Sequence, residues 1–87
     1  MGVTVYPGVV TNTTQVFLQN HYSNYSIQND SGSPGDVIVH YFNDQNTEIG
    51  TYAINPGCSI SDGAGALQFN KFSIECGVDI TAHYRVF

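Results

Sequence analysis

Three short strand-like runs follow one another within residues 47–76, and the turns between them constrain the fold more than any other feature of the sequence. Asn55-Pro56-Gly57 ends the first run, because proline presets φ at the first turn position and glycine accepts a positive φ at the next. Residues 61–66 then form a glycine-containing loop before the last run, which ends at Cys76. The stretch therefore predicts strand, turn, strand, loop and strand.

The composition extends this interpretation to the whole chain of 87 residues. Leu occurs twice, Lys once and Glu twice, whereas Thr, Val, Ile, Tyr and Phe, which suit a pleated sheet, are plentiful. Turn signals recur roughly every 8 to 12 residues, which predicts about seven or eight short strands in an all-β fold. The length suits one domain with a thin core, so we expect a small antiparallel β-sandwich or jelly roll.

The strongest strand signal is the run 36–42, where β-branched and aromatic residues occupy both faces except at His40. This pattern predicts a central strand that is covered on both faces. Residues 43–46 form a turn of suitable length for a hairpin into residues 47–54. The run 79–87 alternates as in a half-buried antiparallel strand, with an inward face formed by Ile80, Ala82, Tyr84 and Val86.

Residues 1–12 stand apart, because their apolar and polar residues alternate and then break at Pro7-Gly8. Proline cannot donate to a strand ladder, so this segment is either a first edge strand or an extended arm that pairs with the edge of another subunit. The side chains available for such assembly are Val3, Val5, Val9 and Val10. We expect residues 13–87 to form the sandwich domain.

Seven acidic residues face only Lys71 and Arg85, which gives a formal net charge of −5. No basic patch is available for phosphates, so we expect no nucleic-acid partner. No apolar run is long enough to span a membrane, and the first residues lack the features of a signal peptide, so we expect no membrane insertion. The polar surface is mostly uncharged, which lets like surfaces pack together because few charges need pairing. This composition permits self-association with other copies of the chain, and it also suits an ordinary secreted domain.

Cys58 and Cys76 are the two cysteines, too few for a structural zinc site without help from histidine. We favour a disulfide between them, which would stabilise the domain by about 3 kcal/mol and indicate an oxidising compartment. Two buried free thiols and a bridge between subunits are the alternatives.

Three histidines raise the question of a metal or catalytic site. His21 lies in a polar turn, whereas His40 and His83 lie in strands where Asp36 or Asp79 could join them, and two histidines with a carboxylate can bind a divalent metal. A histidine on a strand is more often a surface or half-buried structural group, and neither a G-x-S-x-G motif nor a phosphate-binding loop is present. We therefore expect no cofactor, no metal site and no enzyme activity.

Tyr22, Asn24 and Tyr25 offer an alternative function in an asparagine-rich part of the chain. Aromatic rings stack on the apolar faces of sugars, so these residues, with loop 61–66, could contact a glycan in a small lectin-like or adhesive module. Tyrosine is also common in small β cores and at their rims, where its role is structural.

Three motifs in the second half of the chain point to a known family. They are a Pro-Gly turn, an F-S-I-x-C strand and a final alternating strand, here Ile54-Asn55-Pro56-Gly57-Cys58-Ser59, Phe72-Ser73-Ile74-Glu75-Cys76 and Tyr84-Arg85-Val86-Phe87. Through them, residues 44–87 resemble the core domain of bacterial endospore appendage subunits, a jelly-roll family whose members stack into fibres.

The resemblance implies an extracellular subunit at the cell or spore surface that self-assembles into a fibre or oligomer by β-strand addition. Residues 1–12 would be its N-terminal connector. Connectors of this family carry cysteines that link subunits, whereas none precedes Cys58 here. Covalent linkage through the arm is therefore excluded, and ladder hydrogen bonds and buried side chains would hold the assembly.

Overall fold

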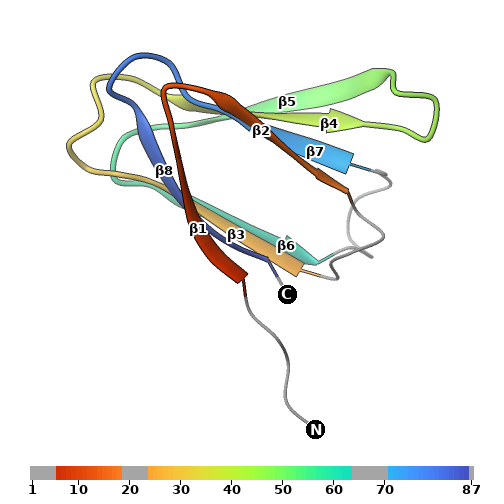
Figure 1. The fold of residues 1–87 in the computed structure, drawn as a ribbon, viewed down its shortest axis with the longest axis horizontal. Helices are drawn as coiled ribbons and strands as arrows, with labels where there is room; N and C mark the ends of the chain where they lie inside the picture. The colour runs from red at the N-terminus through yellow and green to blue at the C-terminus, as the bar shows by residue number, and fades with distance from the viewer. Residues whose placement is uncertain (1–5, 19–23, 64–70, 87) are drawn as a thin grey trace, which may run out of the picture.

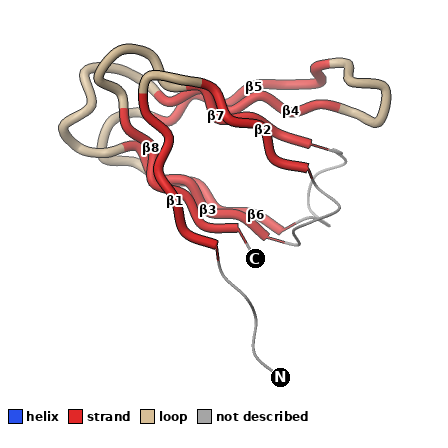
Figure 2. Tube along the Cα trace, viewed as in Figure 1, coloured by secondary structure: helices blue, strands red, loops and turns tan. Residues whose placement is uncertain are grey.

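Eight β-strands make up the described part of the structure, a computed structural model that describes residues 6–18, 24–63 and 71–86 (Figure 1). The described residues contain no helix (Figure 2). The strands are β1 (Tyr6–Thr11), β2 (Thr14–Leu18), β3 (Asn24–Asn29), β4 (Val37–Phe42), β5 (Glu48–Ile54), β6 (Ser59–Gly63), β7 (Lys71–Glu75) and β8 (Thr81–Val86). The predicted all-β class is confirmed.

The strands form two four-stranded antiparallel sheets, in the orders β1-β8-β3-β6 and β2-β7-β4-β5. Consecutive strands alternate between the two sheets except at the β4–β5 hairpin, so the chain winds as a jelly roll. Figure 1 shows the sheets as two layers joined by loops at one end of the sandwich. The expected sandwich or jelly roll is therefore confirmed.

The core lies between the two sheets and consists of side chains that alternate along the strands. Its buried members are Val10, Phe17, Tyr25, Ile27, Val37, Val39, Ile54, Phe72, Ile74, Cys76, Ala82 and Val86. Phe72 is central, because its ring centroid lies 4.9 Å from that of Phe17 and 4.8 Å from that of Tyr25. The inward face predicted for the last strand is confirmed at Ala82 and Val86.

The expectation that the run 36–42 is covered on both faces is wrong. β4 lies inside its sheet between β7 and β5, and Val37 and Val39 are fully buried, but Ile38 and His40 on the other face are only half-buried. The structure places strands on both sides of β4 within the sheet, whereas a second layer packs against only one face. Apolar residues on both faces therefore indicated a central position in the sheet, not a buried outer face.

Two predicted turns are confirmed. In the Pro-Gly turn, Gly57 adopts a φ of 82°, and the Cys58 amide donates to the Asn55 carbonyl at 3.0 Å. The β4–β5 hairpin also forms, and its register shifts between Tyr41 and Phe42. Such a bulge interrupts the ladder close to the tip of the hairpin.

Asn29, at the end of β3, joins the loops at one end of the sandwich. Its side chain is fully buried, and Nδ2 donates to the Ile54 carbonyl at 2.7 Å and to the Gly35 carbonyl at 3.0 Å. Its backbone amide donates to the Cys58 carbonyl and its carbonyl accepts from the Gly57 amide, both at 2.9 Å. One residue thus connects the loop after β3 with the end of β5 and the Pro-Gly turn.

Candidate assembly surface at the sheet edges

β1 is an edge strand of its own chain's sheet. It pairs with β8 from Tyr6 opposite Val86 to Thr11 opposite Thr81. The side chain of Val10 is 1% exposed in the core, whereas that of Val9 is 55% exposed. Val3 and Val5, the other two valines of the predicted arm, lie outside the described residues.

Gly8 allows the ring of Tyr84 to lie across β1. The two residues are directly opposite in the ladder, and a Cβ atom on Gly8 would lie 2.6 Å from Cε2 of Tyr84. The Tyr84 ring also packs edge-on against Phe17 at 4.8 Å, and its hydroxyl accepts from Nε2 of Gln15 at 3.3 Å. This ring therefore joins β1 and β8 to β2 in the other sheet.

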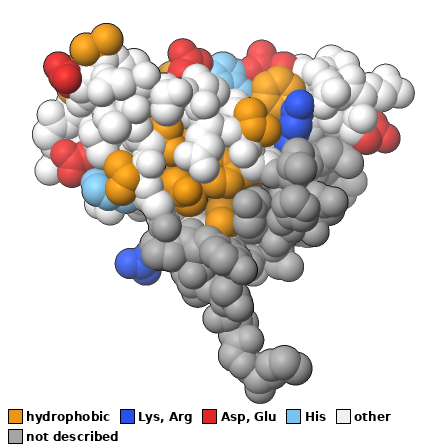
Figure 3. Space-filling model, viewed as in Figure 1, with side chains coloured by type: hydrophobic (Ala, Val, Ile, Leu, Met, Phe, Trp, Pro, Cys, Tyr) orange, Lys and Arg blue, Asp and Glu red, His pale blue; other side chains and the backbone are white. Residues whose placement is uncertain are grey.

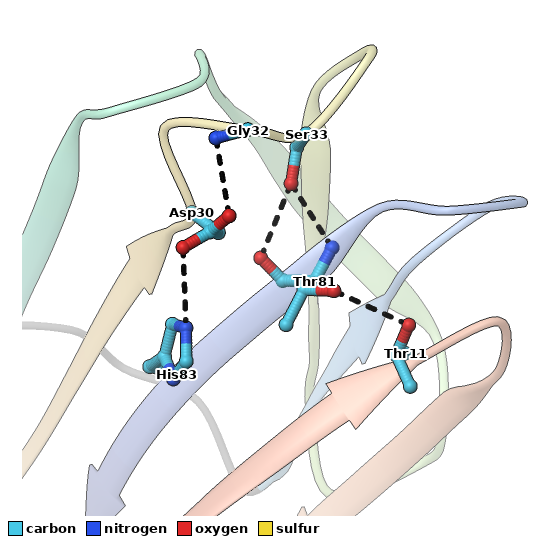
Figure 4. Close-up of polar contacts among 6 residues, drawn as sticks. All are labelled: Thr11, Asp30, Gly32, Ser33, Thr81 and His83. Carbon is cyan, nitrogen blue, oxygen red and sulfur yellow. Dashed lines mark hydrogen bonds and ion pairs between the residues drawn. The ribbon is translucent and has the colours of Figure 1, made fainter.

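Hydroxyl groups hold the opposite end of β1 in place (Figure 4). Oγ1 of Thr81 donates to Oγ1 of Thr11 at 3.3 Å, and the Thr81 amide donates to Oγ of Ser33 at 3.0 Å. Oγ of Ser33 in turn donates to the Thr81 carbonyl at 3.4 Å. The Ser33 hydroxyl is thus engaged with the backbone of β8, which is a structural role.

The two histidines in the described strands have carboxylate partners other than those expected from the sequence. Nε2 of His83 lies 3.5 Å from Oδ1 of Asp30, on an exposed surface (Figure 4). His40 contacts Glu48 and Glu75. Within the described residues, no group of three or more His, Cys, Asp or Glu side chains could hold a metal ion. His21 lies outside the described residues.

The edge strands carry little charge. β1 and β2 are the edge strands on one side of the two sheets, and they contain no charged residue. The opposite edge strands contain one acidic residue each, Asp62 in β6 and Glu48 in β5. In the space-filling view, hydrophobic side chains gather between β1 and β2, and the acidic side chains lie around the rim (Figure 3). Proteins commonly protect sheet edges with charged side chains, lysine above all. The β1 and β2 edges lack that protection.

The predicted disulfide is absent, and both cysteines are free thiols in the structure. Cys58 is exposed just before β6, whereas Cys76 is 3% exposed just after β7. These strands belong to different sheets, and β6 is an edge strand while β7 lies inside its sheet. Their spacing in the sequence carried no information about this separation.

Burial raises the pKa of the Cys76 thiol, which makes it a poor nucleophile.

We expect Ellman's reagent to modify Cys58 rapidly in the native protein and Cys76 only after unfolding. Exposure controls access to the first thiol, and burial protects the second. A Cys58→Ser variant should show no fast phase in native buffer and one reactive thiol in denaturant. Equal native rates for both thiols would contradict the structure, and so would the absence of any free thiol in a non-reduced sample.

The residues predicted to contact a glycan are not gathered on the described surface. Tyr25 is 3% exposed, and its hydroxyl lies 2.9 Å from that of Tyr41. Its ring packs against Phe72, so it is not available to stack on a sugar. Asn24 is half-buried, and Tyr22 lies outside the described residues. Residues 61–63 of the predicted loop belong to β6, and residues 64–66 lie outside the described residues.

No helix in the described part of the chain has the length and apolar character needed to cross a membrane. No protein-family model matches the sequence, and no curated protein matches it.

Two solved structures resemble this fold. One comes from Bacillus endospore appendages, which form a family of disulfide-linked pili; it has a TM-score of 0.55 and 17% sequence identity, and the match covers 95% of this chain and 82% of that chain. The other is the SPBc2 prophage-derived protein YomS, with a TM-score of 0.58, 9% identity, and coverage of 99% of this chain and 96% of that chain. The resemblance to endospore appendage subunits predicted from the sequence motifs is confirmed at the level of the fold.

Proposed function

We propose that this chain is an extracellular structural subunit, located at a cell or spore surface, that self-assembles into a fibre or oligomer by β-strand addition. The observation that carries the proposal is the pair of adjacent, uncharged edges formed by β1 and β2. An edge strand presents unpaired backbone groups to a strand of another chain, and few charges would have to be desolvated when two copies meet.

The N-terminal arm is the connector in this proposal. β1 already pairs with β8, and Val10 fills the core, so residues 6–11 stay in their own sheet. The preceding residues, with Val3 and Val5, supply the strand that pairs with a neighbouring subunit, and the exposed Val9 adds apolar contact at the same edge. The fold shared with a subunit of disulfide-linked pili supports a fibre role. Because the arm contains no cysteine, its contacts are non-covalent.

Charged substitutions at the two edges test this function. Val9 on β1 and Val16 on β2 are each 55% exposed, so Val9→Lys and Val16→Lys should leave the fold intact and prevent assembly. Val78→Lys is the matched control, because Val78 is 79% exposed in the loop between β7 and β8 and belongs to neither edge strand. Deleting residues 2–5 should also give a folded monomer, since β1 remains.

Negative-stain microscopy and size-exclusion chromatography with light scattering provide the readout. We expect fibres or defined oligomers from the full chain and from Val78→Lys, and monomers from the two edge variants and the deletion. A full chain that remains monomeric at high concentration would overturn the proposal. Assembly of the deletion variant at the wild-type level would exclude the arm as the connector.

A further inference from the structure

Three charged side chains lie side by side on the outer face of the β2-β7-β4-β5 sheet. His40 is on β4, and its neighbours Glu48 and Glu75 are on β5 and β7, the two strands that flank β4. Nε2 of His40 lies 2.7 Å from Oε1 of Glu75, and Nδ1 contacts Oε1 of Glu48. We call this group the Glu48–His40–Glu75 cluster.

Contacts from both ring nitrogens to carboxylate oxygens favour a doubly protonated imidazole in the cluster. A neutral imidazole has one donor and one acceptor nitrogen, so one of the two carboxylates would face a lone pair. The imidazolium ion donates from both nitrogens and satisfies both carboxylates. Partial burial alone would lower the pKa of His40, but the hydrogen bonds and negative charges of Glu75 and Glu48 outweigh burial and raise the pKa.

The other groups around the ring leave this charge balance unchanged. Directly opposite His40 in the ladder are two uncharged residues, Thr51 on β5 and Ser73 on β7. Lys71 on β7 is also charged, and its Nζ lies 5.1 Å from the centroid of the Phe42 ring, while Asp36 is exposed directly before β4. The charged groups that act on the pKa of His40 are Glu48 and Glu75. The cluster therefore carries one net negative charge when His40 is protonated and two when it is neutral.

The cluster lies where β5 is least secured. β5 is an edge strand whose first six residues are exposed, with only Ile54 buried. The register shift between Tyr41 and Phe42 interrupts the β4–β5 ladder next to Glu48. The contact between His40 and Glu48 bridges the two strands at that point, while Glu75 secures the imidazole from the other side.

We propose that the Glu48–His40–Glu75 cluster is a pH-responsive clamp that holds the start of β5 on the sheet while His40 is protonated and releases it when His40 becomes neutral. The folded-state pKa of His40 is raised, so the stabilisation is complete below the unfolded value of about 6.5 and is lost as the pH rises through the folded value. Glu48 and Glu75 then face each other across a neutral ring. This device is independent of whether the chain forms fibres.

Nuclear magnetic resonance of the full chain between pH 5.5 and 9 tests the clamp. The imidazole of His40 should titrate above the ordinary histidine range in the wild type and move back toward that range in Glu48→Gln and Glu75→Gln. Hydrogen exchange of the β5 amides that pair with β4 provides the second readout, after correction for intrinsic exchange rates. Their protection should fall with rising pH, up to about tenfold for each unit by which the folded pKa exceeds the unfolded pKa.

Two histidine variants separate the clamp from general effects of pH. His40→Gln should show low protection at the start of β5 at every pH, whereas His83→Gln, which removes the exposed contact to Asp30, should retain the wild-type pH dependence. The proposal fails if His40 titrates at or below the ordinary value. It also fails if β5 protection in the wild type does not depend on pH, or if His40→Gln retains the wild-type dependence.

Discussion

Replacing Asn29 by Ala is expected to lower the free energy of unfolding by about 1 to 3 kcal/mol, the usual cost of one buried polar group left without a partner. The variant loses both hydrogen bonds from Nδ2, to the carbonyls of Ile54 and Gly35. A methyl group offers neither carbonyl a partner; the bond to the Ile54 carbonyl is buried, whereas the bond to the Gly35 carbonyl is partly exposed. Urea denaturation followed by tyrosine fluorescence and circular dichroism would measure the loss.

Asn55→Ala is the matched control, since the Asn55 side chain is exposed in the Pro-Gly turn and a surface change of this kind costs within about 0.5 kcal/mol. Asn29→Asp provides a sharper test. It keeps the shape of the side chain but places a carboxylate against two carbonyl oxygens, so the variant should gain stability as the pH falls and the carboxyl is protonated. Equal stability of Asn29→Ala and Asn55→Ala would contradict the bonds described here.

The class of the fold could be predicted because its signals are local. Turn residues and β-branched runs indicate short strands, and alternation along residues 79–87 indicates which side chains face inward, as Ala82 and Val86 confirm. Alternation identifies a face of a strand but not its neighbours. The pairing of β1 with β8 joins opposite ends of the chain, and no local pattern specifies it.

The cluster at His40 shows the same limit. The partners of His40 are 8 and 35 residues away in the sequence, so they become neighbours only once the register of β4 with β5 and β7 is known. The predicted hairpin placed residues 36–42 beside 47–54, but the bulge decides that Glu48 reaches the ring. The structure shows no bridge between Cys58 and Cys76, and their spacing in the sequence does not reveal that Cys58 is exposed before β6 and Cys76 buried after β7.

In the sequence, Gly8 is only part of the break in the alternation of residues 1–12. In the structure, the missing side chain of Gly8 leaves the space that the Tyr84 ring occupies. Gly8→Ala is expected to lower the free energy of unfolding by about 1 to 3 kcal/mol, the usual cost of overpacking. The added methyl group must displace the Tyr84 ring from Phe17 or lift β1 from β8. Thermal and urea unfolding would measure the change.

A double-mutant cycle with Tyr84→Ala identifies the cause of the Gly8 effect. Without the ring, the methyl group at position 8 meets no obstacle from Tyr84, so Gly8→Ala should be neutral or mildly stabilising in that background, through the reduced entropy of the unfolded chain. Gly50→Ala on β5 is the control, because a Cβ there meets no described atom within 4 Å. An equal cost of Gly8→Ala in both backgrounds would show that the ring does not hold β1.

Hydrogen exchange locates the effect within the sandwich. If the Tyr84 ring holds β1, displacing the ring should loosen the N-terminal edge while the rest of the sandwich stays folded. Gly8→Ala should then increase amide exchange in β1 and β8 at conditions where exchange in β4 and β7 is unchanged.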